Sequence, residues 1–150
     1  MIWGDGARYK GAWRLGWAEG KGRMVDKVGN LYEGEFYMSM AHGLGTFTNT
    51  LGDVYSGEWR FDKKHGHGVE TWVTDSSRYE GQYADGLRHG MGHLFIKDRL
   101  IYQGKWYRGQ MEGPGLFFFD DCKVYDGIFS QGKIEGFGMM RYSDGRIYEG

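Results

Sequence analysis

The sequence predicts an all-β protein, an elongated single-layer antiparallel meander of repeated β-hairpins. Three observations lead to this prediction. A Tyr-x-Gly triplet returns at a nearly constant interval, polar and aromatic residues alternate after it, and the 150 residues combine 28 glycines with an aromatic content of 17%. Disordered glycine-rich chains have few aromatic residues, and collagen needs frequent proline, so neither class fits a chain with one proline.

The repeat is read from the distances between the tyrosines of the triplets, which are 23, 23, 24, 23, 23 and 23 residues. The triplets begin at Tyr9, Tyr32, Tyr55, Tyr79, Tyr102, Tyr125 and Tyr148. After each of the first six, an aromatic residue follows two residues beyond the triplet, and a Gly-x-Gly pair lies 11 and 13 residues after the tyrosine. Agreement at five fixed positions predicts a repeat array. Its units are residues 9–31, 32–54, 55–78, 79–101, 102–124 and 125–147, with partial units at 1–8 and 148–150.

Each unit opens with a predicted strand. The aromatic residues and glycines of the triplet region share one parity, whereas polar residues such as Glu33 and Glu35 share the other, which is typical of a strand with one covered face. Six residues separate this strand from the Gly-x-Gly pair and form a predicted hairpin turn. Four units carry glycine at one position of this turn, where a positive φ is expected; Ser39 and Asp62 replace it in the other two.

The second strand of each unit is expected to begin at the Gly-x-Gly pair and to run for about six residues, as in 113–119. A turn rich in Asp, Asn and Gly then leads to the next unit. The paired glycines of the second strand are expected to form a bare floor beneath the Tyr and Trp rings of the first strand. An isolated hairpin is marginal in water, so neighbouring hairpins must supply the stability.

The charge balance argues against a nucleic-acid partner. Nineteen basic and 20 acidic residues give a formal net charge of -1, and nucleic-acid binding needs a basic excess. The single Cys122 cannot form an internal disulfide, so a reducing, cytoplasmic location is expected. No apolar run approaches the roughly 20 residues of a membrane span.

The sequence offers few candidates for catalytic or metal-binding residues. His42, His65 and His89 stand at equivalent positions of neighbouring units, which lie two strands or roughly 9–10 Å apart, so they cannot ligate one zinc ion within a chain. A zinc ion shared between two chains is the alternative. No Gly-x-Ser-x-Gly elbow occurs, and the acidic neighbours of Cys122 disfavour its thiolate. We expect no enzyme activity, no cofactor and no metal.

The unit Tyr-x-Gly-x-(Trp/Phe)-x6-Gly-x-Gly resembles the MORN (membrane occupation and recognition nexus) repeat, and the resemblance covers essentially the whole chain. It implies a twisted sheet of hairpins, often grooved along one face. It also implies roles in scaffolding, in cytoskeletal and ciliary assemblies such as axonemal or radial-spoke structures, and as accessory regions of lipid kinases or lysine methyltransferases. Membrane and phosphoinositide binding is implied by the family name.

We therefore expect a non-catalytic protein–protein interaction scaffold, with other proteins of a larger assembly as its partners. Most of the aromatic rings are expected to be structural, because they are the only core that a one-layer sheet can have. A single sheet cannot bury both faces, so one aromatic-lined face is also expected to stay partly open and to bind partner segments. The candidate partner-binding residues are Tyr32, Phe36, Tyr55, Trp59, Tyr79, Tyr83, Tyr102 and Trp106. Extra apolar residues that exceed the needs of the repeat indicate a further contact: Trp72, Phe95, Phe117, Phe118 and Phe119.

Two alternatives stay open at the level of sequence. The first is a membrane-proximal module that binds anionic phospholipid through Arg60, Lys63 and Lys64, although nearby acidic residues dilute this cluster. The second is the accessory repeat region of a larger enzyme. Uncovered edge strands invite pairing, so end-to-end or edge pairing is expected if the partial units do not continue into a longer array.

Overall fold

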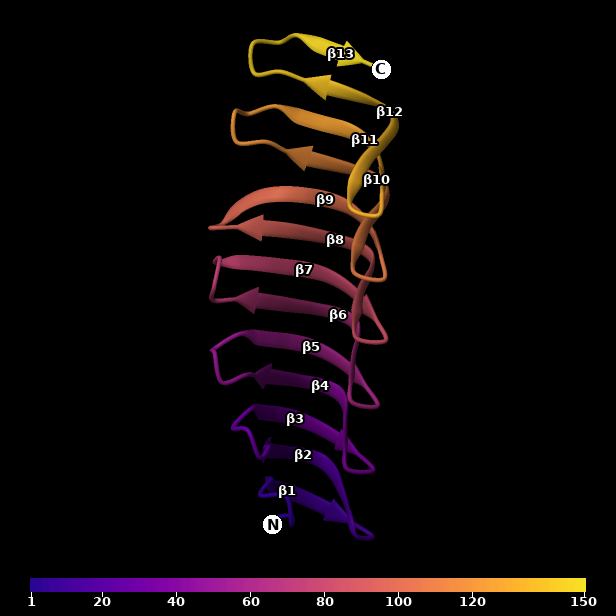
Figure 1. Ribbon diagram of the computed structural model, residues 1–150. Coiled ribbons are helices and arrows are strands. Elements are labelled where there is room, and N and C mark those ends of the chain that lie inside the picture. The colour runs from indigo at the N-terminus through magenta and orange to yellow at the C-terminus, as the bar shows by residue number, and fades with distance from the viewer.

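The computed structural model describes residues 1–150, and it contains a single antiparallel sheet of 13 strands in chain order (Figure 1). The strands are β1 (Arg8–Arg14), β2 (Trp17–Val25), β3 (Leu31–Tyr37), β4 (Met40–Thr48), β5 (Val54–Arg60), β6 (Lys63–Trp72), β7 (Ser77–Ala84), β8 (Leu87–Ile96), β9 (Arg99–Tyr107), β10 (Gln110–Phe118), β11 (Val124–Ser130), β12 (Lys133–Arg141) and β13 (Ile147–Glu149). The predicted fold class is confirmed.

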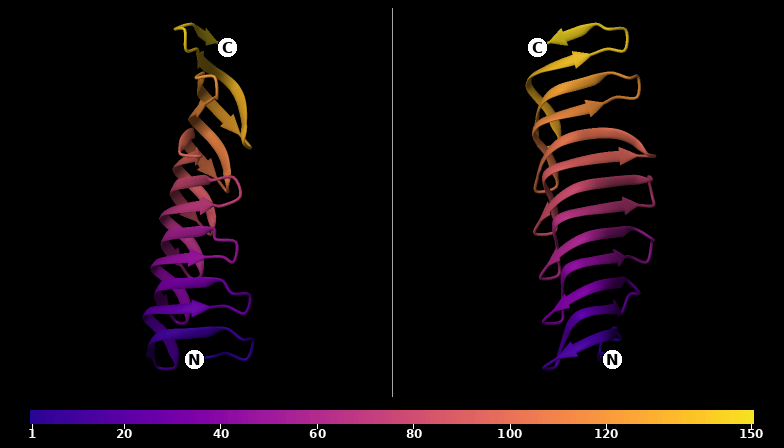
Figure 2. Two further views of the ribbon diagram at one scale, coloured as in Figure 1. Left: turned by 90° about the vertical axis from the view of Figure 1, so that its left-hand side faces the viewer. Right: turned by 180° about the vertical axis from the view of Figure 1, so that it is seen from behind.

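The sheet is a twisted rod with the two termini at opposite ends (Figure 2). Each strand pairs only with the strands before and after it in the chain. The elements that lie far apart in sequence therefore do not touch, and the fold is held by contacts between neighbouring hairpins.

The hairpin turns are shorter than the sequence predicts. Each consists of two residues with positive φ, such as Leu15 (52°) and Gly16 (83°), which is the type I′ geometry that matches the twist of paired strands. Ser39 and Asp62 adopt the same conformation where glycine is absent, with φ of 64° and 67°. The second strand consequently begins three residues before the Gly-x-Gly pair, and the expected start at that pair is wrong.

A bulge explains why the second strand of each unit shows no regular alternation of inward-facing and outward-facing residues in the sequence. Between the pairs Gly11↔Gly22 and Trp13↔Ala18, one residue of β1 stands opposite three residues of β2. Gly20, the first glycine of the pair, lies in the bulge with a φ of 80°. Such bulges bend a strand, and the hairpin tips turn toward the N-terminal end of the rod (Figure 1).

The glycine floor under each tyrosine also differs from the prediction. The Tyr9 ring lies over Gly11 of its own strand and over Gly22 opposite, because a Cβ on either glycine would overlap the ring. The first glycine of each Gly-x-Gly pair belongs to the bulge instead. The Tyr9 hydroxyl group donates to the carbonyl of Ala12 at 2.8 Å, so the buried ring has a satisfied polar end.

The core is a continuous row of rings that we call the aromatic spine. Adjacent rings meet edge to face, with centroids 4.9–5.6 Å apart and interplanar angles of 81–89°, the arrangement that the ring quadrupole favours. In spatial order the spine is Trp13, Tyr9, Phe36, Tyr32, Trp59, Tyr55, Tyr83, Tyr79, Trp106, Tyr102, Phe129 and Tyr125. It joins every pair of neighbouring hairpins from β1 to β12.

Hydrogen bonds also connect the hairpin tips. The amide of Asp62 in one tip donates to the carbonyl of Ala41 in the preceding hairpin at 2.9 Å, and the Asp62 carboxylate accepts from the amide of Ala41 at 2.7 Å. Ser39 makes the same two contacts with Ala18. The two residues that replace glycine therefore strengthen the connection between successive hairpins.

The wide turns at the opposite edge of the sheet are connected in a similar way. The side chain of Asn49 accepts from two amides of its own turn, and its amide group donates to Asp53 at 3.0 Å. The other carboxylate oxygen of Asp53 accepts from the amide of Val73 in the next turn at 2.8 Å. Both long edges of the rod are thus linked from one repeat to the next.

Candidate functional site

The face of the sheet that carries the aromatic spine, here called the inner face, is the candidate functional surface. Pairing across the strands places two rows of side chains beside the spine, because directly opposite residues share a face. The row opposite the second ring of each unit consists of Ala18, Ala41, Lys64, Arg88, Met111 and Ile134. The row opposite the first tyrosine consists of Met24, Phe47, Glu70, Leu94, Phe117 and Met140.

The eight aromatic residues predicted to bind partners all lie in the spine. Seven of them are buried, and Trp59 is half-buried. The Trp59 indole is held in place by donating to the carbonyl of Gly45 at 3.0 Å, and Trp106 makes the equivalent bond to Gly92. These rings form the base of the inner face, and the side chains that a partner could reach are those of the two flanking rows, apart from the buried Ala18 and Ala41.

Burial raises the pKa of several tyrosines of the spine. Removal from water raises the pKa of Tyr102 to about 12, and it raises the pKa of Tyr55 and Tyr79 further. The pKa of Tyr83 is raised by burial and by the neighbouring Glu70 carboxylate. The hydroxyl groups of these residues consequently act as neutral hydrogen-bond donors.

Phe117, Phe118 and Phe119, three of the extra apolar residues singled out in the sequence, line a cleft of about 540 Å³. Two further clefts, here called the first and the second cleft, open along the inner face. The first cleft has a volume of about 400 Å³ and contains Met24, Phe47 and Trp59, with Lys64 at its border. The second cleft has a volume of about 430 Å³ and contains Trp72, Leu94 and Ile96, with Arg88 at its border. Both combine half-buried apolar side chains with a cation. Trp72, one of the extra apolar residues singled out in the sequence, therefore lines a cleft.

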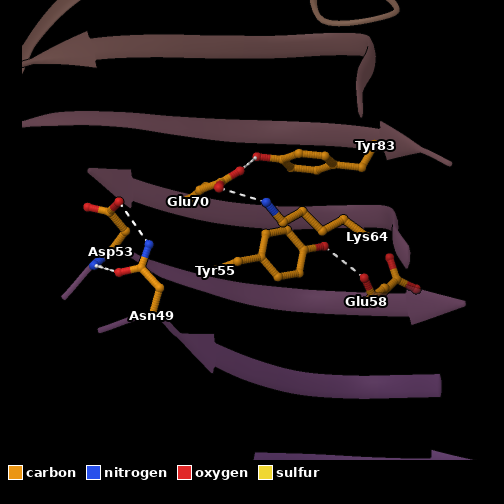
Figure 3. A network of polar contacts seen from close by, with 7 residues as sticks. All are labelled: Asn49, Asp53, Tyr55, Glu58, Lys64, Glu70 and Tyr83. Atoms are coloured by element: carbon orange, nitrogen blue, oxygen red, sulfur yellow. Dashed lines mark hydrogen bonds and ion pairs between the residues drawn. The ribbon is translucent and has the colours of Figure 1, made fainter. Parts of the chain in front are cut away.

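Between the clefts, a polar cluster interrupts the apolar rows (Figure 3). The ammonium group of Lys64 lies 2.7 Å from a Glu70 oxygen and 5.3 Å from the centroid of the Tyr55 ring. The Tyr83 hydroxyl group donates to the other Glu70 oxygen at 2.8 Å. The one tyrosine that replaces Trp or Phe at its repeat position is thus matched to a carboxylate in the preceding hairpin.

The three basic residues proposed for lipid binding do not form one patch. Lys63 and Lys64 are consecutive in β6, so their side chains lie on opposite faces of the strand. Arg60 pairs with Lys63 across the hairpin tip, and both are exposed, whereas Lys64 lies on the inner face against Glu70. The charge of Lys64 is therefore neutralised and separated from the other two.

The remaining candidates from the sequence lie apart from one another. The His42 ring packs on Phe61 with centroids 4.8 Å apart, and its Nδ1 accepts from the Phe61 amide at 3.3 Å. His89 packs against Tyr107 in a later hairpin. No three His, Cys, Asp or Glu side chains come together as a metal site, Cys122 is exposed, and no helix is long and apolar enough to cross a bilayer.

Sequence reasoning missed Arg88, the cation at the border of the second cleft, and the pairing of Glu70 with Lys64. Arg88 lies just after the hairpin turn, in the part of the second strand that the sequence assigned to the loop. A recognisable signal was present, since Lys64 and Arg88 occupy the same repeat position in consecutive units. Only the pairing across the bulge shows that this position faces the spine.

A rod of stacked hairpins, each of which pairs only with its neighbours, defines a linear repeat protein. The pattern of the MORN repeat matches residues 9–31, 32–50, 55–77, 79–98, 102–121 and 125–145, and the chain belongs to the MORN repeat family. MORN repeats are in general modules that bind proteins or lipids, and the family is typically non-catalytic.

Other comparisons add little to this assignment. No curated protein matches the chain. Among solved structures, a catalytically inactive virginiamycin B lyase from Staphylococcus aureus with quinupristin matches at 12% identity and a TM-score of 0.20. The match covers 95% of this chain and 45% of the lyase chain, and a similarity this low carries no argument about fold or function.

Proposed function

We propose that the chain is a non-catalytic protein–protein interaction scaffold that holds segments of partner proteins along its inner face. The observation that carries the proposal is the pair of clefts beside the spine, in which Met24, Phe47, Trp72 and Leu94 stay only half-buried. Apolar clefts with a few charged groups at their borders suit extended or helical segments of other proteins. The buried spine holds the surface rigid, so little ordering accompanies binding.

The setting that we propose is a cytoplasmic cytoskeletal or ciliary assembly, and it rests on membership of the MORN family alone. Binding of anionic lipid is the less favoured function, because Arg60 and Lys63 are separated from Lys64 by the sheet. A pair of exposed cations supplies only about 2 kcal/mol of attraction to an anionic surface.

A photo-crosslinking experiment tests the scaffold function. A photoreactive phenylalanine analogue is placed at Phe47, which faces the first cleft, or at Thr46, which is the preceding residue in β4 and points to the opposite face. We expect the probe at position 47 to crosslink a discrete set of cytoplasmic proteins and the probe at position 46 to give none of them. Equal crosslinking at both positions would contradict the proposal.

Sedimentation with phosphatidylserine vesicles provides the second arm of this test. The scaffold function predicts that the chain stays in the supernatant at physiological salt. Co-sedimentation that is abolished by the double substitution Arg60→Glu and Lys63→Glu would instead favour the lipid-binding function. Both substitutions of this variant lie at exposed tip residues, so its folding is expected to be unaffected.

A further inference from the structure

The second cleft contains a cation that the chain itself does not neutralise. In the row beside the spine, Lys64 is paired with Glu70, but the residue equivalent to Glu70 in the next hairpin is Leu94. Arg88 occupies the position equivalent to Lys64 and forms no ion pair within the chain. A positive charge at the border of an apolar cleft that has no ion-pair partner within the chain points to a ligand that supplies a negative charge.

The guanidinium group of Arg88 is held in a fixed orientation. Its Cζ atom lies 4.5 Å from the centroid of the Trp106 ring, and Nη2 donates to the carbonyl of Gly109 at 3.2 Å. A guanidinium group has five N–H donors, and no nitrogen of Arg88 is buried without a partner. The remaining donors are therefore open to the cleft and to solvent.

The rest of the second cleft restricts what the ligand can be. Trp72 and Leu94 offer half-buried apolar surface beside the guanidinium group. Asp75 also lines the cleft, where its carboxylate accepts from the Ser77 amide at 3.0 Å and adds a negative charge. Arg88 is the one cation among the residues that line this cleft, and repulsion by Asp75 grows with the negative charge of the ligand. A singly charged group is therefore favoured over a phosphate, which carries close to two charges and would need more than one basic residue.

We infer that the second cleft binds an aspartate or glutamate side chain of a partner protein segment, with an adjacent apolar side chain packed on Trp72 and Leu94. The inference rests on the proposed scaffold function and names the chemistry of its ligand. The planar fork of a guanidinium group matches a carboxylate in two parallel hydrogen bonds, and stacking on Trp106 pre-orients that fork. Acidic–hydrophobic segments are therefore the partners that this cleft selects.

Selection from random peptides displayed on phage, with the intact chain as bait, tests the inference. We expect the retained peptides to share an Asp or Glu beside Trp, Phe or Leu. Synthetic copies are then measured by fluorescence anisotropy against the wild type, Arg88→Met and the control Arg23→Met. Met111 occupies the same row as Arg88, so methionine suits this position, and Arg23→Met removes the same charge from the exposed opposite face.

Arg88→Met is expected to weaken binding by about tenfold or more, because a charge-assisted pair is lost, while Arg23→Met leaves it unchanged. Replacing the peptide's Glu by Gln should weaken binding to the wild type by a similar factor and have no effect on Arg88→Met. Arg88→Lys, which keeps the charge without the fork, should give an intermediate affinity. Circular dichroism confirms that each variant is folded.

The outcomes separate this inference from the scaffold function. Peptides that bind but are indifferent to Arg88→Met overturn the carboxylate site and leave the scaffold standing, whereas a chain that retains no peptide overturns both. Binding to phosphatidylserine vesicles that is lost in Arg88→Met would assign the site to lipid. Self-association in sedimentation velocity that is lost in the same variant would assign it to a second copy. Either result overturns the inference.

Discussion

At the scale of single residues, the fold depends on tyrosine rings that lie on bare backbone. Tyr55 is 1% exposed, and its ring occupies the space where Gly68 would carry a Cβ. Glycine weakens a strand by about 0.5–1 kcal/mol relative to alanine, whereas burial of a large apolar side chain contributes about 1.5–3 kcal/mol. The ring and the glycine therefore stabilise the sheet only as a pair. Glycine alone weakens the strand, and without the glycine the ring has no space in which to be buried.

Gly68→Ala is expected to destabilise the protein by about 1–3 kcal/mol, because the added methyl group must displace the Tyr55 ring from a closely packed site. Urea unfolding followed by circular dichroism measures the change. Gly4→Ala is the control, since nothing lies within 4 Å of a Cβ at Gly4. A Gly68→Ala variant as stable as the control would show that the ring can move aside freely.

The raised pKa values of spine tyrosines predict that the stability of the fold depends on pH. Burial raises the pKa of Tyr32, Tyr55, Tyr79, Tyr83 and Tyr102 above the ordinary value of 10.0. The pKa values of these tyrosines in the folded protein exceed their value in the unfolded chain. The stability that comes from keeping their hydroxyl groups neutral is therefore complete below pH 10.0 and is lost as the pH rises through the pKa values of the folded protein.

We therefore expect these five tyrosines to ionise together with unfolding at alkaline pH. Tyrosinate absorbance and far-ultraviolet circular dichroism, recorded in one titration, should show a shared transition for this group. If all eleven tyrosines of the chain ionised before any loss of the circular dichroism signal of the strands, the tyrosines of the spine would be accessible to hydroxide and would not be buried.

At the scale of the elements, the hairpin tip is the unit that connects one repeat to the next. Asp62 combines a positive φ with two hydrogen bonds to Ala41, whereas glycine at the same position of other tips keeps only the backbone bond, as Gly86 does to Lys64. The tip sequence therefore tunes the strength of each connection separately.

Asp62→Ala is expected to lower stability by about 1–3 kcal/mol, because the Ala41 amide loses its acceptor and alanine tolerates the positive φ poorly. Asp62→Gly should recover part of the loss, since glycine adopts this φ without strain. Thermal unfolding ranks the three proteins. If Asp62→Gly were the less stable of the two variants, backbone conformation would not be the deciding factor at this turn.

The elements also show where sequence reasoning reaches its limit. The first strand of each unit was predictable, because its alternation is uninterrupted from Tyr32 to Phe36. In the second strand, the bulge at Gly43 shifts the register, so that the residues before it looked like a loop. The same shift concealed Arg88, and with it the second cleft.

At the scale of the whole molecule, the rod has no central core, and its stability is a sum over neighbouring hairpins. A hairpin in the middle of the array packs on two neighbours, whereas β1 and β13 each have one paired strand. The protection of backbone amides against exchange is therefore expected to fall from the central strands toward both ends.

Native-state hydrogen exchange measures this gradient. We expect slow exchange in the strands around Tyr79, which is fully buried, and faster exchange in the strands around Tyr148, which is exposed. Uniform protection along the chain would indicate one cooperative unit and would contradict the additive description. The overall elongated shape was predictable from the 23-residue period, and so was the role of the aromatic rings as the core of a one-layer sheet. Which rings stay open to a partner was not predictable, because alternation does not distinguish a covered face from an open one.

The links between consecutive hairpins make the rod a molecular ruler. Insertion or deletion of one unit would change the distance between binding surfaces on either side of it by a fixed step of roughly 9–10 Å, set by the spacing of two strands. A cleft is left intact when the inserted unit lies outside the hairpins that form it, which are β1 to β6 for the first cleft and β5 to β8 for the second. In such an architecture, gain or loss of repeats adjusts the separation of bound partners without altering how each of them is recognised.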